Sequence, residues 1–294
     1  MPAWPNQLAA LGFVALDAGI RVVRFRTMVP VPLLRAVAVT VCGDAAAAVT
    51  PARVGGDTMR FLGFRRSGAS RATLLAAFAT EIAADAAVIT AGSLLLATLL
   101  GGAGRAWLRR LMSAAPSPAF ALAVAAAIAA SAVAVPVLLR AARRLGARLD
   151  VSPAEIWRLL SRRPSRTVAA VLALSVVSWT ARAAVLPALA AGTPHTSSLG
   201  LLAGSAALLV GQTLLPTPSG AGATDLAFVA GFARVLPAGQ VAALLVVWRF
   251  YTVALAVVVG GALIAHEAWR VRRRGPCAPP LVTEVQAPPS VTDT

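Results

Sequence analysis

Lysine is absent from this sequence, and charged residues of either sign are scarce. Only 13% of the 294 residues are charged, whereas soluble domains average about a quarter. Apolar residues make up 58% of the chain, and the mean hydropathy is +0.78. At roughly 20 residues per membrane-spanning helix, this length accommodates several spans. The composition therefore excludes a soluble enzyme and predicts a polytopic integral membrane protein.

Residues that commonly carry catalysis or bind metals are also rare. The two cysteines, Cys42 and Cys277, lie in an apolar segment and in a Pro-rich tail, which argues against a disulfide framework. The two histidines, His195 and His266, have no second ligand at metal-binding spacing. Without lysine the chain also has no P-loop. We therefore expect no catalytic residue, no metal and no cofactor, and we predict that the chain is not an enzyme.

All 27 basic residues are Arg, and the formal net charge is +16. Such a charge is typical of proteins that bind either nucleic acid or anionic lipid. Here the Arg clusters lie between long apolar runs. Aromatic residues are only 5% of the chain, whereas proteins that bind single-stranded nucleic acid rely on aromatic stacking platforms. We therefore expect membrane lipids, and not nucleic acid, as partners.

Long apolar runs separated by Pro, Gly and Arg divide the chain into seven membrane-associated segments. They are residues 6–26, 31–49, 70–100, 119–140, 167–190, 198–215 and 238–266. An Arg-rich amphipathic connector is expected at 141–166, and a short helix at 224–236. The predicted fold is an all-α, polytopic membrane helix bundle over residues 1–274. A disordered, Pro-rich cytoplasmic tail is expected at 275–294.

The distribution of Arg predicts how these segments cross the cytoplasmic membrane. The connector and the cluster at 270–274 should be cytoplasmic because they are rich in Arg, and the uncharged loop at 191–198 should face outside. If residues 198–215 and 238–266 both crossed the membrane fully, the Arg-rich cluster at 270–274 would lie outside. This conflict disappears if residues 198–236 enter and leave the membrane from one face, as a re-entrant hairpin. Counting the membrane crossings backwards from the loop at 191–198 makes residues 31–64 a second re-entrant hairpin, which enters from the cytoplasm. The same count of crossings places the N-terminus outside.

The tips of the two predicted hairpins have similar sequences. One reads TPARVGGDTMRF from Thr50, and the other reads TPSGAGATDLAF from Thr217. Each joins Thr-Pro to a Gly-containing turn and then to an acid, Asp57 or Asp225, that can cap the next helix and complement its dipole. Interrupted segments at corresponding positions, entering from opposite faces, indicate an inverted repeat with a site at mid-membrane. The alternative is two ordinary loops that share turn residues.

Charged residues within the spans form a second constellation. Glu81 and Asp85 are four residues apart, so a helix places both on one face. Two carboxylates facing lipid would be costly, so they should face the protein interior and pair with Arg. The candidate partners are Arg53, Arg60, Arg182 and Arg249. The functional interpretation is a polar cavity that binds a charged headgroup, and the alternative is a set of ion pairs that only fixes helix packing.

At these motifs the chain resembles the lysylphosphatidylglycerol synthase transmembrane region, a flippase-like family of bacterial membrane proteins. The matching stretches are PARVGGDTMRFLGFRRSGASRATLLAAFATEIAAD, LLPTPSGAGATDLAFVAGF and WRFYTV. The resemblance implies lipid handling and a substrate-binding site. Its motifs assign to that site Arg53, Gly56, Asp57, Arg60, Glu81, Asp85, Asp225 and Arg249.

The sequence departs from the family pattern at several points. Asp57 and Asp225 stand where Glu is usual, and Ile82 replaces an Arg. We also expect no counterpart of the family's first span. Members with synthase activity carry an added aminoacyl-transfer domain, which this chain is expected to lack. The resemblance therefore implies a flippase-like protein that binds and translocates an anionic or modified (glyco)phospholipid headgroup. The alternative is a non-transporting subunit that recruits or stabilises an envelope-lipid or glycan synthase.

Overall fold

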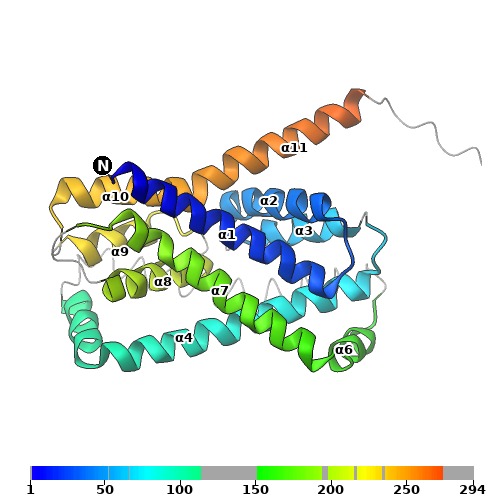
Figure 1. Ribbon diagram of the computed structural model, residues 1–294, viewed down its shortest axis with the longest axis horizontal. Coiled ribbons are helices and arrows are strands. Elements are labelled where there is room, and N and C mark those ends of the chain that lie inside the picture. The colour runs from blue at the N-terminus through cyan, green and yellow to red at the C-terminus, as the bar shows by residue number, and fades with distance from the viewer. Residues whose placement is uncertain are drawn as a thin grey trace, which may run out of the picture.

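The computed structural model describes residues 2–51, 53–65, 67–113, 151–193, 198–214, 217–233 and 236–273. Within these residues the regular secondary structure is helical, and the one β contact is an isolated bridge, which confirms the predicted all-α class. The helices, shown in Figure 1, are α1 (Trp4–Met28), α2 (Leu33–Val49), α3 (Val54–Arg65), α4 (Arg71–Ser113), α6 (Pro153–Ser161), α7 (Ser165–Leu189), α8 (Ser198–Leu214), α9 (Ala223–Phe232), α10 (Ala238–Arg249), the π-helical turn η1 (Phe250–Ala254) and α11 (Leu255–Arg273).

The protein is an all-α helical membrane protein. Three helical stretches in the described part of the chain are long and apolar enough to cross a membrane: Arg71–Gly92, Ser165–Leu189 and Ala238–Arg270. The last of these joins α10, η1 and α11 into one continuous helix. At 1.5 Å per residue, its 33 residues are about 50 Å long, which exceeds the thickness of the hydrocarbon core.

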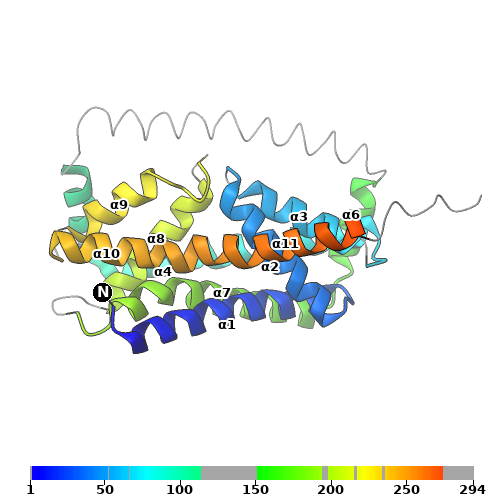
Figure 2. The same ribbon diagram turned by 90° about the horizontal axis from the view of Figure 1, so that it is seen from above.

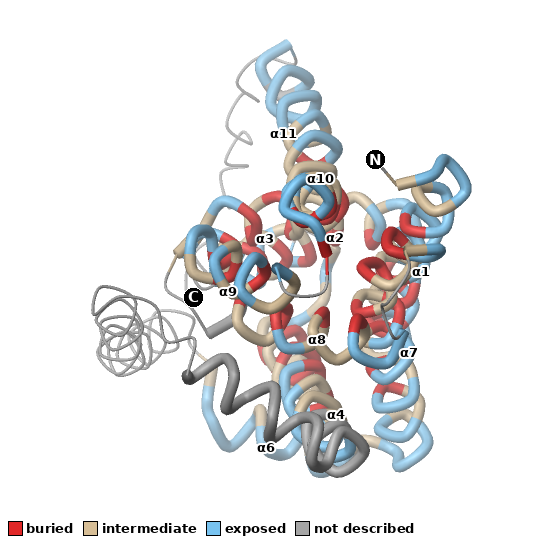
Figure 3. The backbone as a smooth tube through the Cα atoms, turned by 90° about the vertical axis from the view of Figure 1, so that its left-hand side faces the viewer, coloured by how far each residue is buried: buried red, intermediate tan, exposed pale blue. Residues whose placement is uncertain are grey.

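Burial in this fold is the reverse of that in a soluble protein. Large apolar side chains lie on the outer surface, where Leu34 is 83% exposed and Val258 is 65% exposed. Charged side chains lie inside, where Arg24 and Glu81 are each 2% exposed. Figure 3 shows the buried positions on the inward sides of α1, α2 and α7. Lipid tails solvate such an apolar exterior, whereas the charges must find partners within the bundle.

Proline defines where several helices begin. Pro32, Pro164 and Pro237 each precede the first residue of α2, α7 and α10. A proline there costs no helical hydrogen bond, because the first turn of a helix leaves its N–H groups unpaired in any case. At the start of α6, Ser152 caps the helix by accepting a hydrogen bond from the N–H of Ala154 at 3.2 Å.

Two helix–turn–helix units, α2–α3 and α8–α9, meet tip to tip in the middle of the molecule, as Figure 2 shows. An antiparallel bridge joins Pro51 to Pro218, and Ser219 Oγ donates to the carbonyl oxygen of Ala48 at 2.9 Å. Left-handed backbone at Arg53 (φ +59°) and at Ser219 (φ +48°) turns the chain at each tip. The order of elements also repeats, because each unit follows one long helix, α1 or α7, and precedes another. This arrangement agrees with an inverted repeat, and the re-entry of the units into a membrane stays a prediction.

The long helices give the molecule two distinct ends. Figures 1 and 2 place the N-terminus, the end of α7 and the start of α10 at one end. The end of α3, the connector helix α6 and the end of α11 lie at the opposite end. The crossing count from the Arg distribution predicts the same grouping of segments.

The predicted segments differ from the observed helices at the first long span. The sequence predicts a helix over 70–100, but α4 continues to Ser113. The Gly101-Gly102 pair thus lies inside a helix. Each glycine lowers helix stability by about 1 kcal/mol relative to alanine, and the AWLRRLM run that follows compensates because it consists mostly of good helix formers. The predicted connector contains α6 and the first two residues of α7. The predicted span at 119–140 and the tail at 275–294 lie outside the described residues.

Candidate functional site

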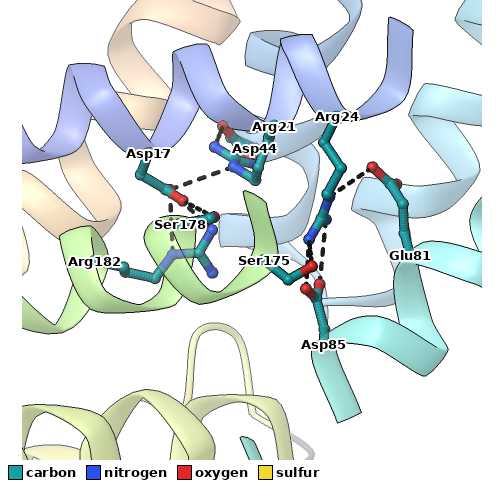
Figure 4. Close-up of polar contacts among 9 residues, drawn as sticks. All are labelled: Asp17, Arg21, Arg24, Asp44, Glu81, Asp85, Ser175, Ser178 and Arg182. Carbon is teal, nitrogen blue, oxygen red and sulfur yellow. Dashed lines mark hydrogen bonds and ion pairs between the residues drawn. The ribbon is translucent and has the colours of Figure 1, made fainter. Parts of the chain in front are cut away.

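Arg24, on α1, is the centre of a buried charge cluster (Figure 4). Its Nε donates to Glu81 at 3.1 Å, and its Nη1 donates to Asp85 at 2.5 Å and to Ser175 Oγ at 2.7 Å. The four-residue spacing of the two acids on α4 directs both carboxylates toward the same guanidinium. One Arg therefore ties α1 to α4 and, through Ser175, to α7.

Arg60, on α3, completes this cluster from the first hairpin. Its Nη2 donates to Glu81 Oε2 at 2.8 Å, so Glu81 bridges two guanidinium groups. The guanidinium carbon lies 5.4 Å from the ring centroid of Phe25 and 5.0 Å from that of Phe78, within cation–π range. Asp57, one turn earlier, is 3.7 Å from Arg60 Nη1, and its side chain is 61% exposed. Arg60 therefore fastens α3 to α4 by both charge and aromatic contact.

A second cluster joins α1, α2 and α7, as Figure 4 also shows. Asp17 accepts from Ser178 Oγ at 2.5 Å and from Arg182 Nη2 at 2.9 Å. Arg21 donates to both carboxylate oxygens of Asp44, at 2.5 and 2.6 Å, and its Nε lies 3.3 Å from Asp17. The bidentate pair and the shared carboxylate give every charge in this cluster an opposite partner.

A third cluster stabilises the tip of the second hairpin. Arg249 Nε donates to Asp225 Oδ1 at 2.6 Å, and its Nη1 donates to the carbonyl oxygen of Ser219 at 2.8 Å. Its Nη2 donates to Thr224 Oγ1. The second carboxylate oxygen of Asp225 accepts from the N–H of Gly222 at 3.0 Å, which confirms that this acid caps α9. Arg249 thus binds the turn, the cap and the first helical turn together.

A cavity of about 300 Å³ lies beside the junction of the two tips. Its walls come from α1, α2, α7, α8 and the segment from η1 into α11, with Arg53 contributed by the tip before α3. Most of the lining is apolar. The charged lining residues are Asp17, Arg21, Asp44, Arg53 and Arg182.

Arg53 differs from the other charged residues around this cavity. Its N–H donates to the carbonyl oxygen of Thr50 at 3.2 Å, which holds the turn. Among the described residues, however, no side chain or carbonyl group forms a hydrogen bond or an ion pair with its guanidinium. A cation inside a membrane protein without a close counter-ion is costly, so Arg53 is a candidate functional residue of this cavity.

The family model described as Lysylphosphatidylglycerol synthase TM region matches residues 3–260 of the chain. The chain belongs to this family. The matched range includes all three clusters and every residue that lines the cavity. A search of curated proteins found no match.

The site residues expected from the family resemblance fall into separate places in this member of the lysylphosphatidylglycerol synthase TM region family. Glu81 and Asp85 pair with Arg24, Arg60 pairs with Glu81, and the exposed Asp57 lies beside Arg60. Asp225 and Arg249 pair with each other at the second tip, and Arg53 lines the cavity. Gly56 is buried against α2, where an added Cβ would lie 2.8 Å from Ala47 Cβ. Gly56 therefore allows α3 to approach α2 closely.

The expected partners of Glu81 and Asp85 were only partly correct. Arg60 does pair with Glu81. Arg182 and Arg249 instead pair with Asp17 and Asp225, because these acids lie nearer on the folded helices. Within the described residues, Arg53 pairs with neither acid.

Sequence reasoning missed Arg24, the partner that Glu81 and Asp85 share. A signal was present, because Asp17, Arg21 and Arg24 follow the i, i+4, i+7 spacing of one helix face. Three charges on one face of a span must turn away from lipid, so that face marks the interior side of α1.

Proposed function

We propose that this protein binds an anionic phospholipid headgroup in the cavity beside the hairpin tips and translocates the lipid across the cytoplasmic membrane. The observation that carries the proposal is the unpartnered guanidinium of Arg53 at this cavity. A phosphate supplies the missing charge, and the planar fork of Arg binds two phosphate oxygens at once. Arg53 is thus the residue that contacts the substrate.

The size and position of the cavity support a headgroup as ligand. Its volume of about 300 Å³ falls at the lower end of small-molecule sites, which suits a headgroup better than a whole lipid. Its mostly apolar walls belong to helices whose outer faces carry exposed Leu and Val. The acyl chains can therefore stay in the bilayer while the headgroup is inside the protein.

The clusters away from the cavity have positioning roles in this proposal. Arg24, Arg60 and Glu81 hold the first hairpin against α1 and α4. Arg249 and Asp225 hold the turn of the second hairpin. These charges keep the two tips in place, and rocking of one repeat against the other would open the cavity to each side in turn.

The orientation follows from the positive-inside rule. The end of the molecule that carries Arg65, α6 and the end of α11 is rich in Arg. The opposite end carries the uncharged residues 190–193 after α7 and the end of α4, whose sequence contains fewer Arg residues, namely Arg105, Arg109 and Arg110. We therefore assign the Arg-rich end, and with it the C-terminus, to the cytoplasm.

A flip assay in reconstituted vesicles tests the proposal. Vesicles with the full chain and a trace of tail-labelled phosphatidylglycerol should expose the label to an external quencher faster than protein-free vesicles. Arg53→Gln should remove this acceleration, whereas Arg65→Gln, a matched change at an exposed position on α3, should keep it. If the folded wild-type protein does not accelerate exchange, it is not a translocase. Copurification with a lipid or glycan synthase would then favour the scaffold alternative.

A further inference from the structure

The charges that line the cavity sum to one positive charge. Three guanidinium groups and two carboxylates line it. Asp44 is paired with Arg21, and Asp17 is paired with Arg182. The remaining charge belongs to Arg53. The cavity is therefore neutralised by a ligand group with one negative charge, and a second negative charge would have no counter-ion.

Gln212, on α8, lines the same cavity and has a buried hydrogen-bond donor that no described residue uses. This side chain lines the cavity and is only 2% exposed. Its Nε2 has no hydrogen-bond partner among the described residues. Buried amides are normally paired, and an exception calls for an explanation such as a ligand. Gln212 lies just before the second tip, whereas Arg53 lies at the first, so each repeat contributes one unsatisfied donor group.

Another part of the cavity wall is the π-helical turn η1. Tyr251 and Thr252 lie in this turn and line the cavity. Single π-helical turns within α-helices are frequent at functional sites, because the widened turn redirects side chains. This third feature, from a different helix, points to the same cavity.

Resting on the proposed function, we infer that the cavity selects a lipid phosphodiester with a single negative charge over a phosphomonoester. The two free oxygens of the diester accept from Arg53, and a further oxygen of the headgroup accepts from Gln212 Nε2. A monoester carries about −1.5 to −2 charges at neutral pH, so part of its charge stays unpaired in this cavity. The single charge of Arg53 determines this selectivity, and Gln212 adds an uncharged hydrogen-bond donor.

The test compares two lipids with the same tails. Binding to the full chain in detergent is measured by native mass spectrometry with phosphatidylglycerol, a monoanionic diester, and phosphatidic acid, a monoester. We expect about tenfold preference for the diester. Gln212→Leu should reduce diester binding about tenfold, while Gln240→Leu, a matched change at an exposed position on α10, should not. Gln212→Glu should abolish diester binding, because the cavity then has no net charge.

Several outcomes would overturn the inference. One is equal binding of the two lipids to the wild-type chain, a comparison that needs no variant. Another is diester binding by a folded Gln212→Leu protein at the wild-type level. Dimethyl phosphate, the diester without acyl chains, should not displace the lipid at equal concentration, and displacement would assign the site to a soluble ligand. Because binding is measured without transport, failure of the flip assay alone would refute the proposed function and not this selectivity.

Discussion

Replacing Arg249 by Ala removes the side chain that fastens the second hairpin tip. Three acceptors then lose their donor: the Asp225 carboxylate, the carbonyl oxygen of Ser219 and Thr224 Oγ1. Of these, the carboxylate is the most costly to leave unpaired. Neutralising it by Asp225→Asn should therefore recover part of the lost stability. Glu81→Gln should recover none, because Glu81 pairs with Arg24 and Arg60 in a separate cluster.

The magnitude follows from the burial of the pair. Removing one partner of a buried ion pair costs about 3–5 kcal/mol. The Asp225 side chain is 33% exposed, so water compensates part of the loss, and we expect about 3 kcal/mol for Arg249→Ala. The coupling energy with Asp225→Asn should be about 1–2 kcal/mol, within the range for contacting residues. The effects of Arg249→Ala and Glu81→Gln should add within about 0.5 kcal/mol.

Thermal unfolding of the full chain in detergent micelles measures both double-mutant cycles. A loss of about 3 kcal/mol corresponds to a decrease in Tm of roughly 6–12 °C. Recovery by Asp225→Asn, without recovery by Glu81→Gln, supports the pairing seen in the structure. The reasoning is refuted if Glu81→Gln is the change that restores Tm, since that result would require Arg249 to contact the Glu81 cluster.

Three further predictions test topology and packing. The orientation is tested in a chain without its native cysteines. Ala191→Cys should react with a membrane-impermeant maleimide only from outside, and Ser161→Cys only from the cytoplasm. The opposite labelling pattern would refute the assigned orientation. Gly260→Ala should lower the free energy of unfolding by about 1–3 kcal/mol, because its Cβ would lie 2.5 Å from a carbonyl oxygen of α2. Gly261→Ala is the control, because an added Cβ there meets no atom within 4 Å and should not lower stability. Equal Tm values for the two variants would contradict the α2–α11 contact. Arg24→Gln should lower the free energy of unfolding by about 3 kcal/mol, because two acids on α4 lose their shared cation. An unchanged Tm would show that the ion pairs of Arg24 do not stabilise the fold.

The helices and the hairpin tips could be predicted from sequence because their signals are local. Pro and Gly interrupt the apolar runs at Pro51 and Pro218, and these two residues form the bridge between the tips. An acid opens the helix after each tip, and Asp225 caps α9 as predicted. The Gly101-Gly102 pair misled the assignment of α4, since glycine weakens a helix without always ending it.

The pairing of the charges could not be predicted, because it depends on contacts between distant helices. Four Arg residues were plausible partners for Glu81, and sequence spacing alone does not rank them. The guanidinium of Arg24 reaches Glu81 across 57 positions in the chain, through the packing of α1 beside α4. The unpaired state of Arg53 is even less accessible to sequence, because it is a property of all the helices around the cavity.

Native mass spectrometry of the protein purified from membranes tests most directly whether Arg53 holds a lipid. The wild-type chain should retain a phospholipid with one phosphate, Arg65→Gln should retain the same lipid, and a folded Arg53→Gln protein should lose it. Retention of that lipid by Arg53→Gln at the wild-type level would contradict the assignment of the cavity as a headgroup site.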